Sequence, residues 1–206
     1  MLRIRRYQPG DREAVRRICM DTAKGSFRTK PKKREAVAAM FIDYNLEYEP
    51  EHCFVAEEDG RVCGYCAYST DMDKLRAAMH GDLYRRVFRI NPVYAWFMRG
   101  CAATSAKLAQ RYGGGGFHLN VEEGHQGQKI GPKLLAVMGK HLAVSLGYRY
   151  MYLVTENRRT RGYSFYRHFG FVEAARCGLG TLCLTYDLPG IDERLGKYGI
   201  DFNTVT

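Results

Sequence analysis

The sequence predicts an α/β fold of the α+β type, in which helices cover both faces of a mixed sheet. Short β-like segments alternate with helical ones in the order β α α β β, a helical insert, and then β α β α β β, about seven strands in all. The 206 residues are enough for one large domain, and no linker argues for two. We therefore expect one domain over 1–206, with an insert at 71–116 and a C-terminal tail at 189–206.

The amino-terminal part begins with a strand over Leu2–Tyr7, which Pro9 and Gly10 end. Asp11 is placed to cap a helix with apolar residues on one face, and a second helix is expected over about 32–48. Two strands then flank a hairpin turn signal at Glu58-Asp59-Gly60. The predicted strands are Cys53–Glu57 and Arg61–Ser69.

The insert shows helical patterning that is broken at Asn91, with Pro92 well placed in the first turn of a new helix. Four glycines, Gly113–Gly116, end the insert and precede a strand. A phosphate-binding glycine loop follows a strand, so this position favours a flexible connector.

The carboxyl-terminal part begins with a strand over Phe117–Val121, followed by a glycine-containing loop and a long helix. That helix has apolar residues every four positions and ends at Gly147. A strand, a short helix and a hairpin complete the pattern. Their predicted ranges are Tyr150–Val154, Arg161–Phe169, Phe171–Cys177 and Thr181–Asp187.

The composition is that of an ordinary globular protein, with 46% hydrophobic and 26% charged residues. Met1–Arg6 lacks the apolar core of a signal peptide. No stretch approaches the roughly 18 to 20 apolar residues that cross a bilayer. We expect a cytoplasmic protein without a membrane partner.

The net charge of +10 favours a polyanionic partner, either nucleic acid or a phosphorylated cofactor. The basic residues form scattered clusters without an aromatic platform for bases, which disfavours nucleic acid. Cys63 and Cys66 are the one close cysteine pair, and a spacing of three in a strand predicts opposite faces. No second pair supplies further zinc ligands, so we expect buried thiols and no metal.

The segment Leu119–Gly131 runs from a strand into a helix and is the most informative in the chain. Such a turn presents unpaired backbone N–H groups where the helix dipole also favours an anion, so a pyrophosphate would fit. It is not a Walker A loop, because Ile130 follows Lys129 where Ser or Thr would hold magnesium. It also lacks the G-x-G-x-x-G pattern of a Rossmann dinucleotide site.

Val121–Leu135 resembles the acyl-CoA-binding motif of the GNAT acetyltransferase superfamily, V-x-P-x-x-Q/R-G-x-G-I-G-x-x-L-L. The positions in register are Gln126, Gly127, Ile130, Gly131, Leu134 and Leu135. Glu123 replaces the usual proline and Lys129 the usual glycine. Lys129 either takes a positive φ and crowds the pyrophosphate, or takes a helical φ and adds a favourable charge. Pro132 falls within the first helical turn, where its missing N–H matters little.

A second segment, Asn157 with Ser164–Phe171, is similar to the family element N-x-x-A-x-x-x-Y-x-x-x-G-F, although Asn157 lies two residues further from Tyr166 than usual. Two motifs in the correct order are far more specific than either alone. The resemblance spans Leu2 to about Asp187 and implies a GNAT-like, mostly antiparallel central sheet.

The resemblance implies that acetyl-CoA is the co-substrate. The backbone of Leu119, Asn120 and Val121 would bind the pantetheine arm as an added strand, and the N–H groups from Gly127 to Gly131 would hold the pyrophosphate. The cofactor-binding residues implied in this way are Leu119, Asn120, Val121, Gln126, Gly127, Gln128, Lys129, Ile130, Gly131, Pro132 and Asn157.

Acetyl transfer to an amine needs a base for the amine proton and an acid for the leaving thiolate. Tyr166 resembles the acid of the family, and the alternative is that it only packs within its helix. Glu123 is the first candidate for the base, since it shares strand parity with Leu119 and Val121. Glu122 or His118 is the alternative, and family members also use a chain of waters.

We therefore expect an acetyl-CoA-dependent N-acetyltransferase that acts on a primary amine by direct transfer. The acceptor, a small-molecule or peptide amine, cannot be read from the chain. The alternative is an acyl-CoA-binding sensor or interaction module without turnover. The insert at 71–116 is expected to line the acceptor pocket or to form the surface of a homodimer.

Overall fold

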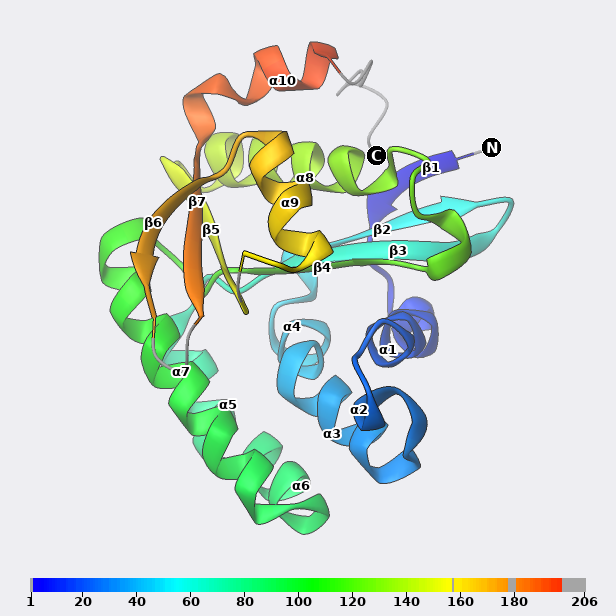
Figure 1. Cartoon of the computed structure of the whole chain (residues 1–206), viewed down its shortest axis with the longest axis vertical. Helices are drawn as coiled ribbons and strands as arrows, with labels where there is room; N and C mark the ends of the chain where they lie inside the picture. Colours follow the sequence, from blue (N-terminus) through cyan, green and yellow to red (C-terminus); the bar gives the residue numbers. More distant parts are fainter. Residues whose placement is uncertain (1, 157, 178–180, 198–206) are drawn as a thin grey trace.

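A computed structural model describes residues 2–156, 158–177 and 181–197. Seven strands within these ranges form two antiparallel sheets (Figure 1). The first sheet has the order β1-β2-β3-β4 and the second β5-β7-β6. The strands are β1 Leu2–Arg6, β2 Cys53–Glu58, β3 Arg61–Tyr68, β4 Phe117–Val121, β5 Tyr150–Thr155, β6 Val172–Arg176 and β7 Leu182–Asp187. The predicted fold class is confirmed. The expectation of a single central sheet was wrong, because no ladder joins β4 to β5 in the described ranges.

Helices cover both faces of the first sheet. One face packs on α8, which continues into a π-helical turn over His141–Ser145. The opposite face packs on α1 and α3. The helices are α1 Arg12–Asp21, α2 Ser26–Thr29, α3 Pro31–Phe41, α4 Asp43–Tyr48, α5 Met72–His80, α6 Asp82–Ile90, α7 Pro92–Tyr112, α8 Ile130–Lys140, α9 Arg161–Phe169 and α10 Ile191–Lys197. None of these helices is long and apolar enough to cross a membrane.

The single helix expected over 32–48 is two helices, because the backbone breaks at Ile42 with φ −134° between α3 and α4. Asp11 also differs from its predicted role, since its side chain makes no cap bond to α1. Its carboxylate instead pairs with Arg5 at 2.6 Å and accepts the N–H of Gln8 at 2.8 Å. The Asp11 carboxylate thus bonds to the segment just before α1 instead of capping that helix.

The insert between β3 and β4 is helical, as predicted, and consists of α5, α6 and α7. It packs against α3 and α4 around Tyr44, Leu83 and Met98, a third apolar cluster apart from the two that cover the sheet. In Figure 1 the insert extends away from the sheet beside α3 and α4.

The glycine run after the insert is closely packed rather than a flexible connector. The hydroxyls of Tyr68 and Tyr152 donate to the carbonyls of Gly113 at 2.8 Å and Gly114 at 2.9 Å. A Cβ at Gly114 would lie 2.3 Å from the Tyr68 ring, and Gly114 has φ +62°. Only glycine satisfies both demands, so the run fixes where β4 begins.

Cys63 and Cys66 are buried thiols, as expected, but they do not lie on opposite faces. Both belong to the apolar cluster under α8. The register of β2 and β3 shifts between Ala56 and Glu57, opposite Cys63, which breaks the simple alternation of the strand. In the described ranges, no group of three or more His, Cys, Asp or Glu side chains could hold a metal ion.

Candidate active site

The site begins where the two sheets separate. β4 pairs with β3 along one edge, with Leu119 opposite Cys66 and Asn120 opposite Tyr65. Its other edge has no ladder partner in the described residues. β4 and β5 are nevertheless close at one end, because a Cβ at Gly116 would lie 3.3 Å from the carbonyl oxygen of Tyr152. The predicted residues Leu119, Asn120 and Val121 therefore line a strand edge to which an extended chain could add.

The loop after β4 turns back so that α8 starts directly beyond it. A short 3-10 turn, Glu123–His125, is followed by Gly127 at φ +84° and by the first residue of α8, Ile130. The Gln126 side chain donates to the carbonyl of Val121 at 3.2 Å, which ties the loop to the end of β4. Gly127 has a backbone conformation that favours glycine strongly, and nothing lies within 4 Å of a Cβ built on it.

This loop leaves a set of backbone donors free. Within the described part of the chain, the N–H groups of residues 127–131 donate to no backbone acceptor outside the helix. Those of Ile130 and Gly131 open the first turn of α8, where no intrahelical acceptor exists. Pro132, next in the turn, has no N–H to leave unpaired. The arrangement fits a pyrophosphate held by main chain and helix dipole.

Lys129 takes the first of the two conformations considered above. It is left-handed, with φ +60° and ψ 15°, directly before α8, and its side chain is exposed. A non-glycine residue in this region costs roughly 1–2 kcal/mol relative to an ordinary backbone. Strain is therefore concentrated at the turn into the candidate anion site, at the position where the family motif has glycine.

Tyr166 lies in α9, which the Thr160 side chain caps by accepting the N–H of Tyr163 at 3.1 Å. Its ring contacts Phe117 of β4 with centroids 5.6 Å apart. Burial raises the pKa of the Tyr166 phenol above its ordinary value, so the hydroxyl keeps its proton at neutral pH. No described residue forms a hydrogen bond with that hydroxyl. The Tyr166 ring thus packs in the core, and its hydroxyl has no described hydrogen-bond partner.

Contact between α9 and α8 brings Tyr166 to the loop. A Cβ at Gly131 would lie 3.0 Å from the Phe165 ring, so α9 packs directly on the first turn of α8. Phe165 is the neighbour of Tyr166 in sequence, and their ring centroids are 5.0 Å apart. The two segments that resemble family motifs therefore meet in space.

Glu123 lies beyond the end of β4, in the 3-10 turn, so the strand-parity argument for it was wrong. Its side chain is 73% exposed and pairs with Arg28 at 2.7 Å. Glu122 is more enclosed and pairs with Arg17 at 2.5 Å and Arg61 at 2.9 Å. Burial alone would raise the pKa of Glu122, but the two arginines outweigh it and hold that pKa below its ordinary value. Both carboxylates are thus engaged by arginine.

His118 is the group that sequence reasoning undervalued. It lies on β4 and faces α3, where its ring stacks on Phe41 with centroids 5.6 Å apart. Its Nδ1 is 2.9 Å from the Tyr65 hydroxyl, which also accepts from the Asn120 amide at 2.9 Å. Burial lowers the pKa of His118 to about 4, so the imidazole is neutral at physiological pH. Only the β3–β4 pairing brings these three side chains together.

Comparison with known families identifies the family of the chain. A family model described as "Acetyltransferase (GNAT) family" matches residues 13–171, most of the chain. The chain belongs to the GNAT acetyltransferase family. No curated protein matches the sequence.

Solved structures share this GNAT fold. SsHAT has 22% identity and a TM-score of 0.77, over 91% of this chain and 98% of that one. An N-acetyltransferase from Staphylococcus aureus Mu50 has 16% identity and a TM-score of 0.57, over 89% and 99%. A polyamine N-acetyltransferase from Drosophila melanogaster, which forms N-acetylagmatine, has 12% identity and a TM-score of 0.56, over 91% and 100%. At such identities the likeness shows the fold alone.

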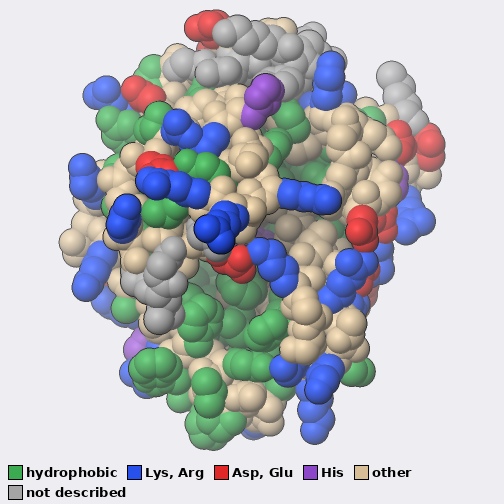
Figure 2. All heavy atoms as spheres, viewed as in Figure 1, with side chains coloured by type: hydrophobic (Ala, Val, Ile, Leu, Met, Phe, Trp, Pro, Cys, Tyr) green, Lys and Arg blue, Asp and Glu red, His purple; other side chains and the backbone are tan. Residues whose placement is uncertain are grey.

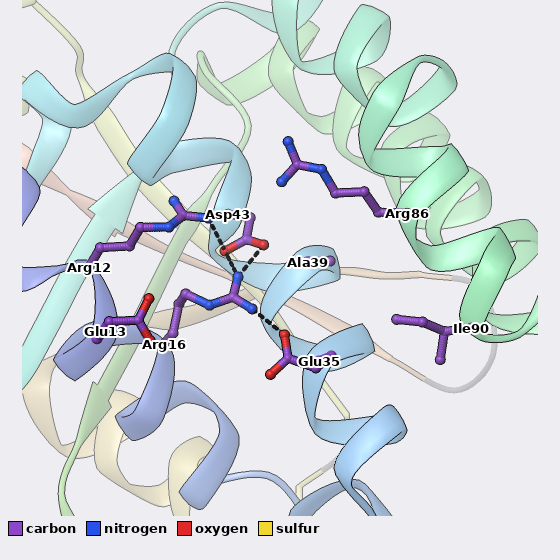
Figure 3. A pocket seen from close by; sticks show the side chains of 8 residues that line it. All are labelled: Arg12, Glu13, Arg16, Glu35, Ala39, Asp43, Arg86 and Ile90. Atoms are coloured by element: carbon purple, nitrogen blue, oxygen red, sulfur yellow. Dashed lines mark hydrogen bonds and ion pairs between the residues drawn. The ribbon is translucent and has the colours of Figure 1, made fainter.

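One predicted residue is not described by the structure, and one cavity lies apart from the predicted site residues. Asn157 falls outside the described residues. A separate cavity of about 350 Å³ lies among α1, α3, α4 and α6 (Figure 3). Arg16 there pairs with Asp43 and Glu35, so the main charges of the cavity compensate one another. None of the predicted site residues lines it.

Proposed function

We propose that the chain is an acetyl-CoA-dependent N-acetyltransferase that transfers the acetyl group directly to a primary amine. The observation that supports this most is the set of free N–H groups at residues 127–131, next to the unpaired edge of β4. A free strand edge can bind the amides of pantetheine, and the helix N-terminus that follows it in the chain can bind the pyrophosphate.

Cofactor binding is proposed to depend mainly on backbone. Leu119, Asn120 and Val121 offer their free edge to the pantetheine amides. The turn from Gln126 to Gly131 offers N–H groups to the pyrophosphate, and Lys129 adds a positive charge. The side chains of Gln126 and Gln128 hold the turn by donating to the carbonyls of Val121 and Gly124.

In the reaction, the thioester supplies the acetyl group and releases a thiolate. The amine nitrogen forms a bond to the acetyl carbon, the carbon–sulfur bond breaks, and the amine loses a proton. Tyr166 is proposed to donate its proton to the sulfur, because its phenol is protonated and without a described partner. Its contact with Phe117 holds it at the start of β4.

Two residues are candidates for the base that accepts the amine proton. Glu123 stays a prediction, although it would first have to leave Arg28. His118 is the second candidate, because it is neutral and lies on β4 itself. A neutral imidazole can accept a proton directly or through water.

A second function is a GNAT domain that binds acyl-CoA as a sensor without turnover. The pairing of Glu123 with Arg28 favours it, since the first candidate base is engaged. One assay distinguishes the two functions. The protein is mixed with acetyl-CoA and a panel of amines, and released thiol is measured over time. Amine-dependent release supports the transferase, whereas tight acyl-CoA binding without release supports the sensor.

We further propose that residues 1–206 act as one domain and that the protein is cytoplasmic. The insert at 71–116 is proposed to bound the acceptor site, because it packs on α3 and α4 and follows β3 directly. The alternative for its outer face is the surface of a homodimer. A small-molecule or peptide amine is the proposed partner, and neither a metal nor nucleic acid is required.

A further inference from the structure

A recess opens on the face of β4 opposite α8. Figure 2 shows hydrophobic side chains gathered in the recessed part of this face, between the elements that Figure 1 labels α7 and α2–α3. Phe41, the last residue of α3, is 42% exposed although its ring stacks on His118 of β4. A large aromatic side chain left open beside a strand of the proposed site indicates a binding surface rather than a core position.

Aromatic side chains from α2 and α7 meet beside Lys33 of α3. Phe27 of α2 and Tyr94 of α7 have ring centroids 5.1 Å apart. Phe97 lies three residues beyond Tyr94, on the same side of α7, and is 37% exposed. We call the set Phe27, Phe41, Tyr94, Phe97 and His118 the aromatic cleft.

A positive charge lies against two rings of the cleft. Lys33 lies over the rings of Phe27 and Tyr94, 5.4 and 5.9 Å from their centroids. The carboxylates that follow β4 and β5 are engaged, Glu123 by Arg28 at 2.7 Å and Glu156 by Lys24 at 2.5 Å. An acceptor with a second ammonium group would meet Lys33 and would find neither of these carboxylates free.

We propose that the aromatic cleft binds the body of the acceptor, and that the acceptor is a primary amine on an aromatic or aliphatic body without a second cationic group. This inference rests on the proposed transferase function and names its substrate class. The apolar body stacks on Phe41 and Phe97, so its single amino group is directed to β4 beside His118. Nearby positive charge also favours the neutral amine, the form that attacks the thioester.

The test compares four amines with the full chain: 2-phenylethylamine, ethylamine, 1,4-diaminobutane and spermidine. Thiol release gives kcat/KM for each. We expect 2-phenylethylamine to exceed the diamine and spermidine by about 10-fold or more, since a few apolar contacts discriminate by this amount. Phe41→Ala should lower the ratio of kcat/KM for 2-phenylethylamine to kcat/KM for ethylamine by about 10- to 100-fold. The ratio is used because any effect of the variant on His118, which Phe41 contacts, acts on both amines alike.

Two further variants control the result. Phe88→Ala removes a 47%-exposed phenylalanine of α6 and should leave the preference unchanged. Lys33→Gln should raise the relative rate with 1,4-diaminobutane, because it removes the repelling charge. Calorimetric titration with acetyl-CoA confirms that each variant is folded.

The outcomes separate the two proposals. A preference for spermidine, or an equal effect of Phe41→Ala and Phe88→Ala, would overturn the substrate class and leave the transferase function intact. Absence of acyl-CoA binding by the wild-type protein, or acetyl-CoA binding with no amine acetylated, would instead remove the proposed function, and the substrate class with it.

Discussion

The Glu49 carboxylate accepts the backbone N–H of Thr70 with both oxygens at 3.0 Å. It also accepts the Thr70 hydroxyl and the N–H of Asp71 at 2.9 Å. Glu49 follows α4, and Thr70 begins the connection to the insert. One carboxylate, 2% exposed, therefore fastens the helical insert to the core.

Glu49→Gln is expected to destabilise the protein. The amide keeps the shape but replaces an ionised acceptor with a neutral group that has one acceptor oxygen, so about 2–3 kcal/mol of unfolding free energy should be lost. Urea unfolding measures it. Glu51→Gln, two residues on with a 58%-exposed side chain, is the control and should change stability by less than about 0.5 kcal/mol. Equal effects of the two variants would contradict the anchoring role.

Lys129→Gly is expected to stabilise the protein by about 1 kcal/mol, because glycine tolerates the positive φ that lysine adopts only with strain. Lys129→Ala keeps the strain and removes the charge. If the lysine contributes charge to the anion site, both variants should weaken acetyl-CoA binding, and only the glycine variant should raise the unfolding free energy. A glycine variant no more stable than the alanine variant would argue against a strained turn.

Acid should destabilise the protein through His141. Its Nε2 lies 2.9 Å from His52 Nδ1, and burial, with the charges of Arg6 and His52, lowers its pKa to about 4. The unfolded state, with a pKa near 6.5, then binds a proton that the folded state refuses, so stability falls as the pH drops from about 6.5 toward 4. Between pH 7 and 5 this group should contribute a loss of roughly 2 kcal/mol. His141→Gln should show that much less pH dependence, and an unchanged slope would exclude His141 as the cause.

Tyr166→Phe should lower kcat by about 10²- to 10⁴-fold if the phenol is the acid. The acetyl-CoA dissociation constant should stay the same, since the hydroxyl has no described partner whose loss would disturb the fold. Pre-steady-state thiol release compares the chemical step in the two proteins. Unchanged turnover would leave Tyr166 with a packing role against Phe117 only.

His118→Gln and Glu123→Gln distinguish the candidate bases. The variant that removes the true base should lower kcat by about 10²-fold or more, while the other should change it little. Because the pKa of His118 is about 4, a mechanism that uses this imidazole should show no loss of the base between pH 8 and 6. Full activity in both variants would indicate a water chain without a dedicated base.

Much of the fold was predictable because local patterns suffice for it. The turn at Glu58–Gly60 and the bounds of β4 and α9 followed from periodicity and caps. The cofactor loop was also accessible, since its binding groups are main chain and its signature is contiguous in sequence. What failed depends on contacts between distant segments. The break at Ile42, the packing of Gly114 on Tyr68 and the bulge opposite Cys63 all have tertiary causes.

The catalytic side was harder to predict for the same reason. His118 acquires its properties from Phe41 and Tyr65, which lie 77 and 53 positions away in sequence. The isolation of β4 from β5 likewise appears only once both sheets are formed. No local signal in the sequence marks the aromatic cleft, whose members come from α2, α3, α7 and β4.

The most direct test of the account is calorimetric titration of the full chain with acetyl-CoA, with adenosine in a parallel titration. The free backbone N–H groups at residues 127–131 predict that one acetyl-CoA binds per chain. They also predict much weaker binding of adenosine, which has no pyrophosphate or pantetheine. Failure of acetyl-CoA and longer acyl-CoA esters to bind, or equal affinity for adenosine, would contradict it.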